Sequence, residues 1–170
     1  MPNALIERKG ALTALLTTRG FRDTLEMRRE HRYDLYDLGI RLPEPLVPRR
    51  LRWEVSERIL GDGTIDFAID LLEVESLASR ALAEGVESIA VCFLHSYRNA
   101  RHEQAAAELI RRVAPSIPVS ISSDVVPEIG EYVRTSTTVA NAYVQPTVDR
   151  YLAAIEDNLR AVEVLSLIHI

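Results

Sequence analysis

The sequence ESIAVCFL at residues 87–94 decides the fold class, because it is a short and nearly continuous apolar run. A strand needs such a run when both faces of a parallel sheet are covered. Two further short runs, ALTALLT at 11–17 and PVSIS at 118–122, also predict buried strands. Helical patterns at 69–84 and 101–113 separate the three strands. This alternation predicts an α/β fold with βαβ units, a mostly parallel sheet and right-handed crossovers.

Shorter helices are predicted at 3–9 and 21–29, on either side of the first strand. In the helix at 69–84, the pattern places five residues inward, namely Leu72, Leu77, Ala78, Ala81 and Leu82.

The chain between the first strand and the helix at 69–84 is less regular. Residues 30–50 contain three prolines near their end and are predicted to form a long ordered loop. The sequence LRWEVSERIL at 51–60 alternates, which predicts one half-exposed strand. The turn GDG at 61–63 leads to a return strand at 64–67. We expect a charged β-hairpin at a surface or a sheet edge.

The densest run of unusual residues is PEIGEYVRTSTTVANAYVQP at 127–146. It is predicted to begin a helix at Pro127, with Ser123 or Asp124 as the N-cap. A proline at its end predicts a kink or break before an amphipathic helix at 147–162. At helical spacing one face carries four polar residues, Glu131, Arg134, Thr138 and Asn141. This face is interpreted either as an ordinary polar helix face or as the wall of a binding cleft.

Polar residues also follow two of the predicted strands. Thr17, Thr18 and Arg19 follow the first strand, and His95 and Ser96 follow the run at 87–94. Ligands of open α/β sheets bind beyond the carboxyl ends of strands, so these residues are candidate contacts. The alternatives are a plain strand-to-helix turn at the first position and a histidine that bonds to local backbone at the second.

Composition excludes several classes of protein. The net charge of −5 and the scattered basic residues argue against nucleic-acid binding. Cys92 is the single cysteine, which excludes an intrachain disulfide and fits a reducing compartment. No apolar run of membrane-spanning length is present, so we expect no membrane partner and a cytoplasmic location. The four histidines lack metal-ligand spacing, so no metal site is predicted, and no glycine-rich phosphate loop occurs.

Five segments together resemble the hydantoinase A/5-oxoprolinase family, in that family's order. They lie at residues 3–23, 32–38, 43–59, 85–103 and 126–146. The resemblance implies the fold of one lobe of an actin-like ATPase or sugar kinase. It also implies an ATP-dependent hydrolase that opens cyclic amides, such as a hydantoin or 5-oxoproline. Members of this family work with a B-type part, either as a separate subunit in a hetero-oligomer or as a fused domain.

The sequence departs from the family pattern at both ends. The family's acidic, glycine- and threonine-rich phosphate loop has no counterpart here, and neither does the second half of the superfold. We therefore expect residues 1–164 to be a fragment. They would form a partial N-terminal domain that runs into the next domain from about residue 127. The sequence LSLIHI at 165–170 is unlike the family and is interpreted as a non-native tail. The fragment is expected to be inactive alone.

For the intact parent, the resemblance implies ATP and Mg²⁺ as cofactors and a small cyclic amide as substrate. The roles assigned by this hypothesis are anion stabilisation for Arg134, proton transfer for His95, and hydrogen bonding for Asn141 and the threonines. Two alternatives stay open. One is an acetone-carboxylase-type subunit that activates a ketone and bicarbonate. The other is a non-catalytic interaction subunit that docks through residues 30–50 and 51–67.

Overall fold

The computed structural model describes residues 2–29, 39 and 43–161. A four-stranded sheet lies at its centre, with the strand order β2-β1-β5-β6 and every pair parallel. The strands are β1 (Thr13–Thr18), β2 (Arg52–Val55), β5 (Ser88–Cys92) and β6 (Val119–Ile121). The predicted α/β class with a parallel sheet is therefore confirmed.

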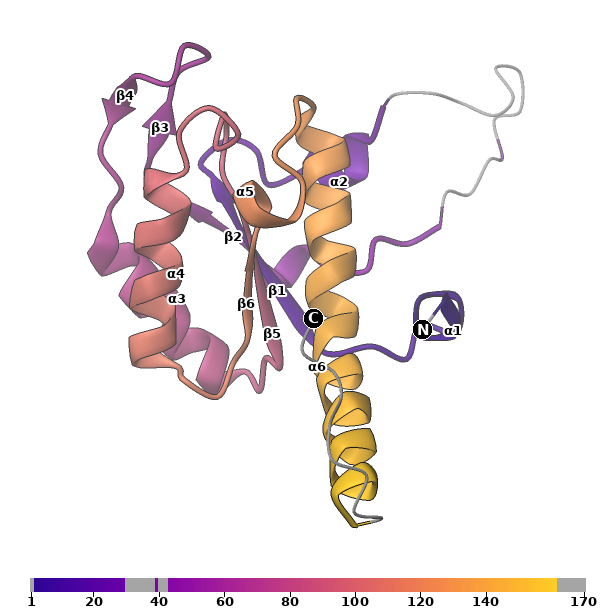
Figure 1. Cartoon of the computed structure of the whole chain (residues 1–170). Coiled ribbons are helices and arrows are strands. Elements are labelled where there is room, and N and C mark those ends of the chain that lie inside the picture. Colours follow the sequence, from indigo (N-terminus) through magenta and orange to yellow (C-terminus); the bar gives the residue numbers. More distant parts are fainter. Residues whose placement is uncertain (1, 30–38, 40–42, 162–170) are drawn as a thin grey trace.

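Helices cover both faces of this sheet (Figure 1). Helices α3 (Leu71–Ala83) and α4 (Arg101–Val113) pack together on one face. The long helix α6 (Glu131–Ala161) lies on the other face, where it contacts three strands and α2 (Thr24–Met27). The remaining short helices are α1 (Pro2–Ile6), the 3-10 turn η1 (Arg49–Leu51) and α5 (Ser122–Val125). No helix in the described ranges is both long and apolar enough to cross a membrane.

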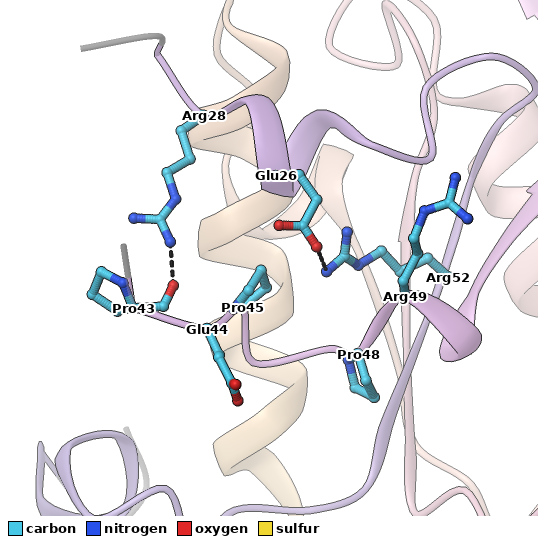
Figure 2. A pocket seen from close by; sticks show the side chains of 8 residues that line it. All are labelled: Glu26, Arg28, Pro43, Glu44, Pro45, Pro48, Arg49 and Arg52. Carbon is cyan, nitrogen blue, oxygen red and sulfur yellow. Dashed lines mark hydrogen bonds and ion pairs between the residues drawn. The ribbon is translucent and has the colours of Figure 1, made fainter. Parts of the chain in front are cut away.

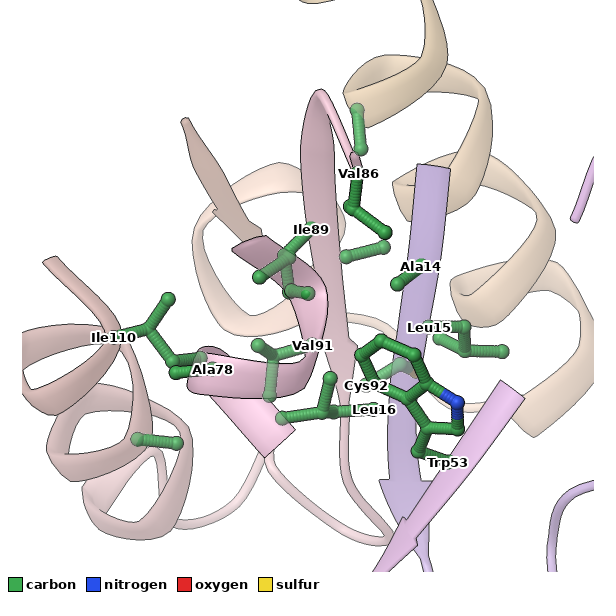
Figure 3. Packing of buried hydrophobic residues seen from close by; sticks show 14 of the residues in the cluster. Ala14, Leu15, Leu16, Trp53, Ala78, Val86, Ile89, Val91, Cys92 and Ile110 are labelled. Atoms are coloured by element: carbon green, nitrogen blue, oxygen red, sulfur yellow. The ribbon is translucent and has the colours of Figure 1, made fainter. Parts of the chain in front are cut away.

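Strand β5 is buried along its whole length, as the run at 87–94 predicts. Its side chains alternate between the two helical layers. Ile89 and Val91 pack toward Ala78 of α3 and Ile110 of α4 (Figure 3). Cys92 faces the opposite layer, where its Sγ lies 3.2 Å from Thr135 Oγ1 of α6. This strand therefore joins both halves of the core.

The start of α6 differs from the prediction. The helix begins at Glu131 instead of Pro127, and the expected cap residues lie in the separate helix α5. Gly130 has φ +119°, a conformation that favours glycine, and it turns the chain between α5 and α6. A glycine in this conformation cannot continue a helix, so the regular turns begin after it.

Of the kink or break predicted at Pro146, the break is wrong, because α6 runs through this residue to Ala161. Proline fits the helical φ and removes one backbone donor. The turns before it are anchored by the buried residues Val139, Ala142 and Tyr143. We infer that this packing outweighs the lost hydrogen bond.

The predicted single strand at 51–60 is split into two. Its first half, β2, belongs to the main sheet as an edge strand beside β1. Its second half, β3 (Arg58–Ile59), pairs antiparallel with β4 (Ile65–Phe67) and forms the expected hairpin. Arg52 lies on the opposite side of the alternation from Leu51 and Trp53, yet it is buried, and its guanidinium bonds to Val47 O at 2.9 Å and to Glu26 Oε1 at 2.9 Å.

The inward stripe of α3 also differs in part. Ala78 and Ala81 are buried as predicted, whereas Leu72 is 79% exposed and Leu82 is 45% exposed. The buried stripe instead includes Val74, because residues 74, 78 and 81 follow one line along the helix. At helical spacing Leu82 lies beside that line and Leu72 falls on the opposite face of the helix.

The N-cap of α3 provides a first testable prediction. Asp70 Oδ1 accepts hydrogen bonds from the backbone nitrogens of Leu72 at 3.0 Å and Glu73 at 3.1 Å. Asp70→Ala should lower the free energy of unfolding by about 1 kcal/mol, measured by urea denaturation. Asp70→Asn keeps a capping oxygen and should stay close to the parent chain. Equal losses in both variants would contradict a capping role.

The helices predicted at 3–9 and 21–29 are shorter in the structure, as α1 and α2. Most of the predicted loop at 30–50 and the whole tail at 165–170 lie outside the described residues.

Candidate functional site

The carboxyl ends of the four parallel strands meet at one edge of the sheet. The chain leaves β1 through α2, on the side of α6, whereas α3 and α4 make the later crossovers on the opposite face. Strands β1 and β5 are neighbours. The connection that leaves β1 and the one that leaves β5 therefore pass on opposite faces of the sheet. Open α/β sheets bind ligands at such a switch point. The candidate site therefore lies where β1 and β5 end.

Thr18 joins these two strand ends. Its Oγ1 accepts a hydrogen bond from Leu94 N at 2.8 Å and donates one to Glu57 Oε1. Glu57 Oε2 lies 2.7 Å from His102 Nδ1, and all three side chains are buried. The group Thr18–Glu57–His102 thus ties β1 to the start of α4.

Thr17 and Arg19, the residues on either side of Thr18, do not belong to this group. Arg19 points outward and forms an ion pair with Glu73 at 2.8 Å. Thr17 is buried and lines a small cavity between β1, β5 and α6.

Arg134 of α6 holds the turn that follows β5. Only 2% of this residue is exposed. Its Nη2 donates to Phe93 O at 2.8 Å, its Nη1 donates to Ser96 Oγ, and its guanidinium lies 5.5 Å from the centre of the Tyr97 ring. The guanidinium of Arg134 therefore binds to groups inside the protein, and these contacts fix residues 93–97.

Glu103 of α4 supplies the matching negative charge. Its Oε1 accepts from Phe93 N at 2.8 Å and from Ser122 Oγ at 2.6 Å, and its Oε2 accepts from Ser123 N at 2.8 Å. Ser122 Oγ lies 2.9 Å from Ser96 Oγ. The chain Arg134–Ser96–Ser122–Glu103, here called the strand-end network, links the ends of β5 and β6 to α4 and α6.

His95 lies in the turn that this network holds. Its φ is +54°, in the left-handed region that non-glycine residues rarely adopt. The ring is partly buried, and its Nδ1 lies 3.5 Å from Tyr97 Oη. Strained residues of this kind concentrate at functional sites, where the surrounding structure fixes them. The turn thus presents an imidazole at the switch point.

The predicted polar face of α6 packs against the sheet. Thr138 is buried and its Oγ1 donates to Arg134 O at 2.7 Å, while Asn141 Nδ2 donates to Ser120 Oγ at 3.0 Å. Glu131 lines the same small cavity as Thr17. Arg134 and Glu131 therefore lie near the strand ends and Asn141 lies against the middle of β6, while Arg134 and Thr138 are in the interior and not on the wall of an open cleft.

The volume of the small cavity beside Thr17 can be compared with the size of a nucleotide. Its volume is about 10 Å³, enough for roughly one water molecule. Within the described ranges, no three histidine, cysteine or acidic side chains gather in a way that could hold a metal ion. The cavity between β1, β5 and α6 is therefore too small to hold a nucleotide.

A larger cavity, of about 420 Å³, lies beside the amino end of β2 (Figure 2). Three arginines line it, but each already has an acceptor. Arg28 donates to Pro43 O, Arg49 to Asp23, and Arg52 to Glu26. Because these cations are paired and the cavity lies away from the strand ends, it is not part of the candidate site.

Sequence reasoning missed Glu57, His102, Glu103 and Ser122. The sequence holds a signal for two of these four residues. Glu57 continues the inward alternation of Leu51, Trp53 and Val55. Glu103 precedes the buried stripe of Ala106, Ala107 and Ile110 at helical spacing. A carboxylate on an apolar stripe is expected to have a buried partner.

Cys92 provides a prediction on pH dependence. Burial raises the pKa of its thiol above the ordinary value of 9.0. Above about pH 9 the unfolded chain loses this proton and the folded chain keeps it, so stability should fall as pH rises. Compared with a Cys92→Ala variant, the parent should lose unfolding free energy more steeply above pH 9 in urea titrations. Parallel curves for the two chains would contradict this effect.

A sequence model of the hydantoinase/oxoprolinase N-terminal region matches residues 1–114. The chain belongs to this family. The family assignment from the five segments is therefore confirmed.

Relatives of this hydantoinase/oxoprolinase chain include a caprolactamase subunit and a 5-oxoprolinase. Caprolactamase subunit alpha of Pseudomonas jessenii is 38% identical over 91% of the chain and 22% of that protein. The 5-oxoprolinase of Saccharomyces cerevisiae is 31% identical over 95% of the chain and 14% of that protein. The chain thus spans less than a quarter of the length of these relatives.

Two solved structures share the fold. The ATP-dependent caprolactamase from Pseudomonas jessenii superposes with a TM-score of 0.86 at 38% identity, over 93% of this chain and 23% of that one. A nucleotide-free acetone carboxylase superposes with a TM-score of 0.81 at 29% identity, over 94% of this chain and 24% of that one. These neighbours confirm that the chain has the fold of this family's actin-like ATPase-type lobe.

Proposed function

We propose that this chain is part of an ATP-dependent hydrolase that opens cyclic amides. The main support is its similarity to the ATP-dependent caprolactamase, because 93% of the chain superposes on that enzyme at 38% identity. Caprolactam is a cyclic amide, like 5-oxoproline, the substrate implied by the name of a second relative. The intact parent is expected to work with a B-type partner, and other parts of the enzyme would hold ATP and Mg²⁺.

The proposed role of this chain is to build one wall of the catalytic centre. Residues 93–97 would present His95 for proton transfer, and Arg134 would act as a positioning residue through its bonds to Phe93 and Ser96. Thr17, Thr18 and Asn141 would fix the strand ends around this turn by hydrogen bonds. Arg19, Glu131 and Thr138 would support the same edge of the sheet.

The domain assignment also stays a proposal. Residues 1–164 would form a partial N-terminal domain that runs into the next domain from about residue 127. The family match to residues 1–114, which ends before α6 begins, supports this division.

An acetone-carboxylase-type reaction is the second candidate, supported by the TM-score of 0.81 to acetone carboxylase. The two reactions differ in co-substrate, because carboxylation needs bicarbonate and ring opening needs water. ADP release by the intact parent with its B-type partner should separate them, with caprolactam, 5-oxoproline, a hydantoin and acetone as substrates. Stimulation by a cyclic amide without bicarbonate is expected. Stimulation by acetone with bicarbonate alone would establish the carboxylase, and no ADP release with any substrate would favour an interaction subunit.

A further inference from the structure

Tyr97 has a hydroxyl beside the imidazole of His95. Its Oη lies 3.5 Å from His95 Nδ1, and the two rings meet edge to face with their centres 6.0 Å apart. Both side chains are partly buried. Hydrogen bonds of a catalytic group are often long before the substrate binds and shorten when it does. We therefore take this contact as a hydrogen bond, whose direction decides which nitrogen of His95 carries the proton.

Two cations lie beside the Tyr97 ring. The guanidinium of Arg134 lies 5.5 Å from the ring centre, and that of Arg98 lies 5.8 Å from it. Positive charges next to a phenol ring draw electron density away from its oxygen, so the hydroxyl is a better donor than acceptor. Tyr97 Oη therefore donates to His95 Nδ1, and the neutral imidazole keeps its own proton on Nε2.

The backbone around His95 fixes the direction in which the imidazole points. His95 O accepts from Arg98 N at 2.9 Å and from Asn99 N at 3.3 Å. Asn99 Nδ2 also donates to Gly63 O at 2.9 Å, which ties this turn to the β3–β4 hairpin. A Cβ atom placed on Gly61 of that hairpin would lie 4.0 Å from His95 Nε2. Gly61 has no side chain that would cover this nitrogen.

We propose that Tyr97 is a positioning residue that keeps the proton of His95 on Nε2, where the imidazole can give it to a substrate. The inference rests on the proposed function, in which His95 transfers a proton. When the carbon–nitrogen bond of a cyclic amide breaks, its electron pair goes to the nitrogen, which then needs a proton. Nε2 supplies this proton while Nδ1 takes the proton of Tyr97 Oη, so the imidazole stays neutral. The phenolate that is left lies beside Arg98 and Arg134 and regains a proton from water.

The position of the proton can be read from long-range proton–nitrogen NMR correlation spectra of the isotope-labelled chain of 170 residues. A His95→Gln variant identifies the signals of this ring among those of the four histidines. Where the ring is neutral, we expect the proton on Nε2 and the lone pair on Nδ1. A ring that carries its proton on Nδ1 would overturn the proposal.

A variant of the chain shows whether Tyr97 causes this preference. Tyr97→Phe keeps the ring beside the two guanidinium groups and removes only the hydroxyl. The Nδ1 resonance of His95 should shift, because this nitrogen loses its donor. Tyr132→Phe, at a partly buried tyrosine of α6, is the matched control and should leave the His95 resonances unchanged. Identical His95 resonances in the Tyr97→Phe chain and the unsubstituted chain would overturn the proposal.

The same two variants test proton transfer in the intact parent with its B-type partner. Tyr97→Phe should lower the kcat of ring opening at least about tenfold and change KM by less than about threefold. Tyr132→Phe should keep the kcat of the unsubstituted enzyme. An unchanged kcat for Tyr97→Phe would overturn the role in proton transfer. Absence of ring opening by the unsubstituted parent would overturn the proposed function alone, because the NMR spectra of the chain decide the position of the proton independently.

Discussion

Replacing Arg134 by alanine is expected to lower the free energy of unfolding by about 3 kcal/mol or more. The substitution leaves Phe93 O and Ser96 Oγ without the donors that they have in the folded protein. It also creates a cavity, because the guanidinium is buried beneath Tyr97. Urea denaturation followed by circular dichroism measures the loss.

A second variant separates the planar hydrogen-bonding geometry of the Arg134 guanidinium from its charge, and a third serves as a control. Arg134→Lys keeps the charge but cannot bond to two acceptors with a planar fork, so it should recover only part of the loss. Arg150→Ala, at an exposed arginine on the same helix, should change stability by less than about 0.5 kcal/mol. In the intact parent, Arg134→Ala should also strongly reduce the kcat of ATP-dependent ring opening. A stability loss below about 1 kcal/mol, or unchanged kcat and KM, would contradict the positioning role.

Glu103→Ala is expected to be at least as damaging, with a loss of about 3–5 kcal/mol. Three donors lose their acceptor at once, namely Phe93 N, Ser122 Oγ and Ser123 N. The buried charge of Arg134 also loses the anion that balances it through two serines. Removing one member of a buried charge network costs more than its net contribution, because the other member stays uncompensated.

Glu108→Ala is the matched control, since this glutamate is exposed on the same helix. It should stay within about 0.5 kcal/mol of the parent in the same urea titration. The double variant Arg134→Ala with Glu103→Ala tests coupling. Its loss should be clearly smaller than the sum of the single losses, because the two charges act in one network. Strict additivity would show that the two residues act independently.

Elements with strong periodic signals could be predicted from the sequence. The helix expected at 101–113 is α4, with the same bounds, and the run at 87–94 contains the central strand β5. The candidate residues at the ends of β1 and β5 also lie at the switch point, as parallel strands require. Local sequence pattern was sufficient here, because burial on both faces leaves a continuous apolar run.

Other features depend on contacts between distant parts of the chain. Arg52 reads as a solvent-facing residue, but Glu26 and Val47 O make its burial possible. The strand-end network joins residues 93–97 to α4 and α6, so no local window contains both charges. The first half of the predicted hairpin joined the main sheet, because β1 offered it a parallel partner. Spacing alone cannot show such pairings.

The most direct test of the proposed function measures two products in one reaction. The intact parent, with its B-type partner, is mixed with ATP and caprolactam or 5-oxoproline, and ADP and the ring-opened amino acid are both quantified over time. We expect ADP and the ring-opened amino acid to appear together in equal amounts. Neither product should form when ATP or the cyclic amide is left out. Ring opening without ATP, or ADP release that a cyclic amide does not stimulate, would contradict it.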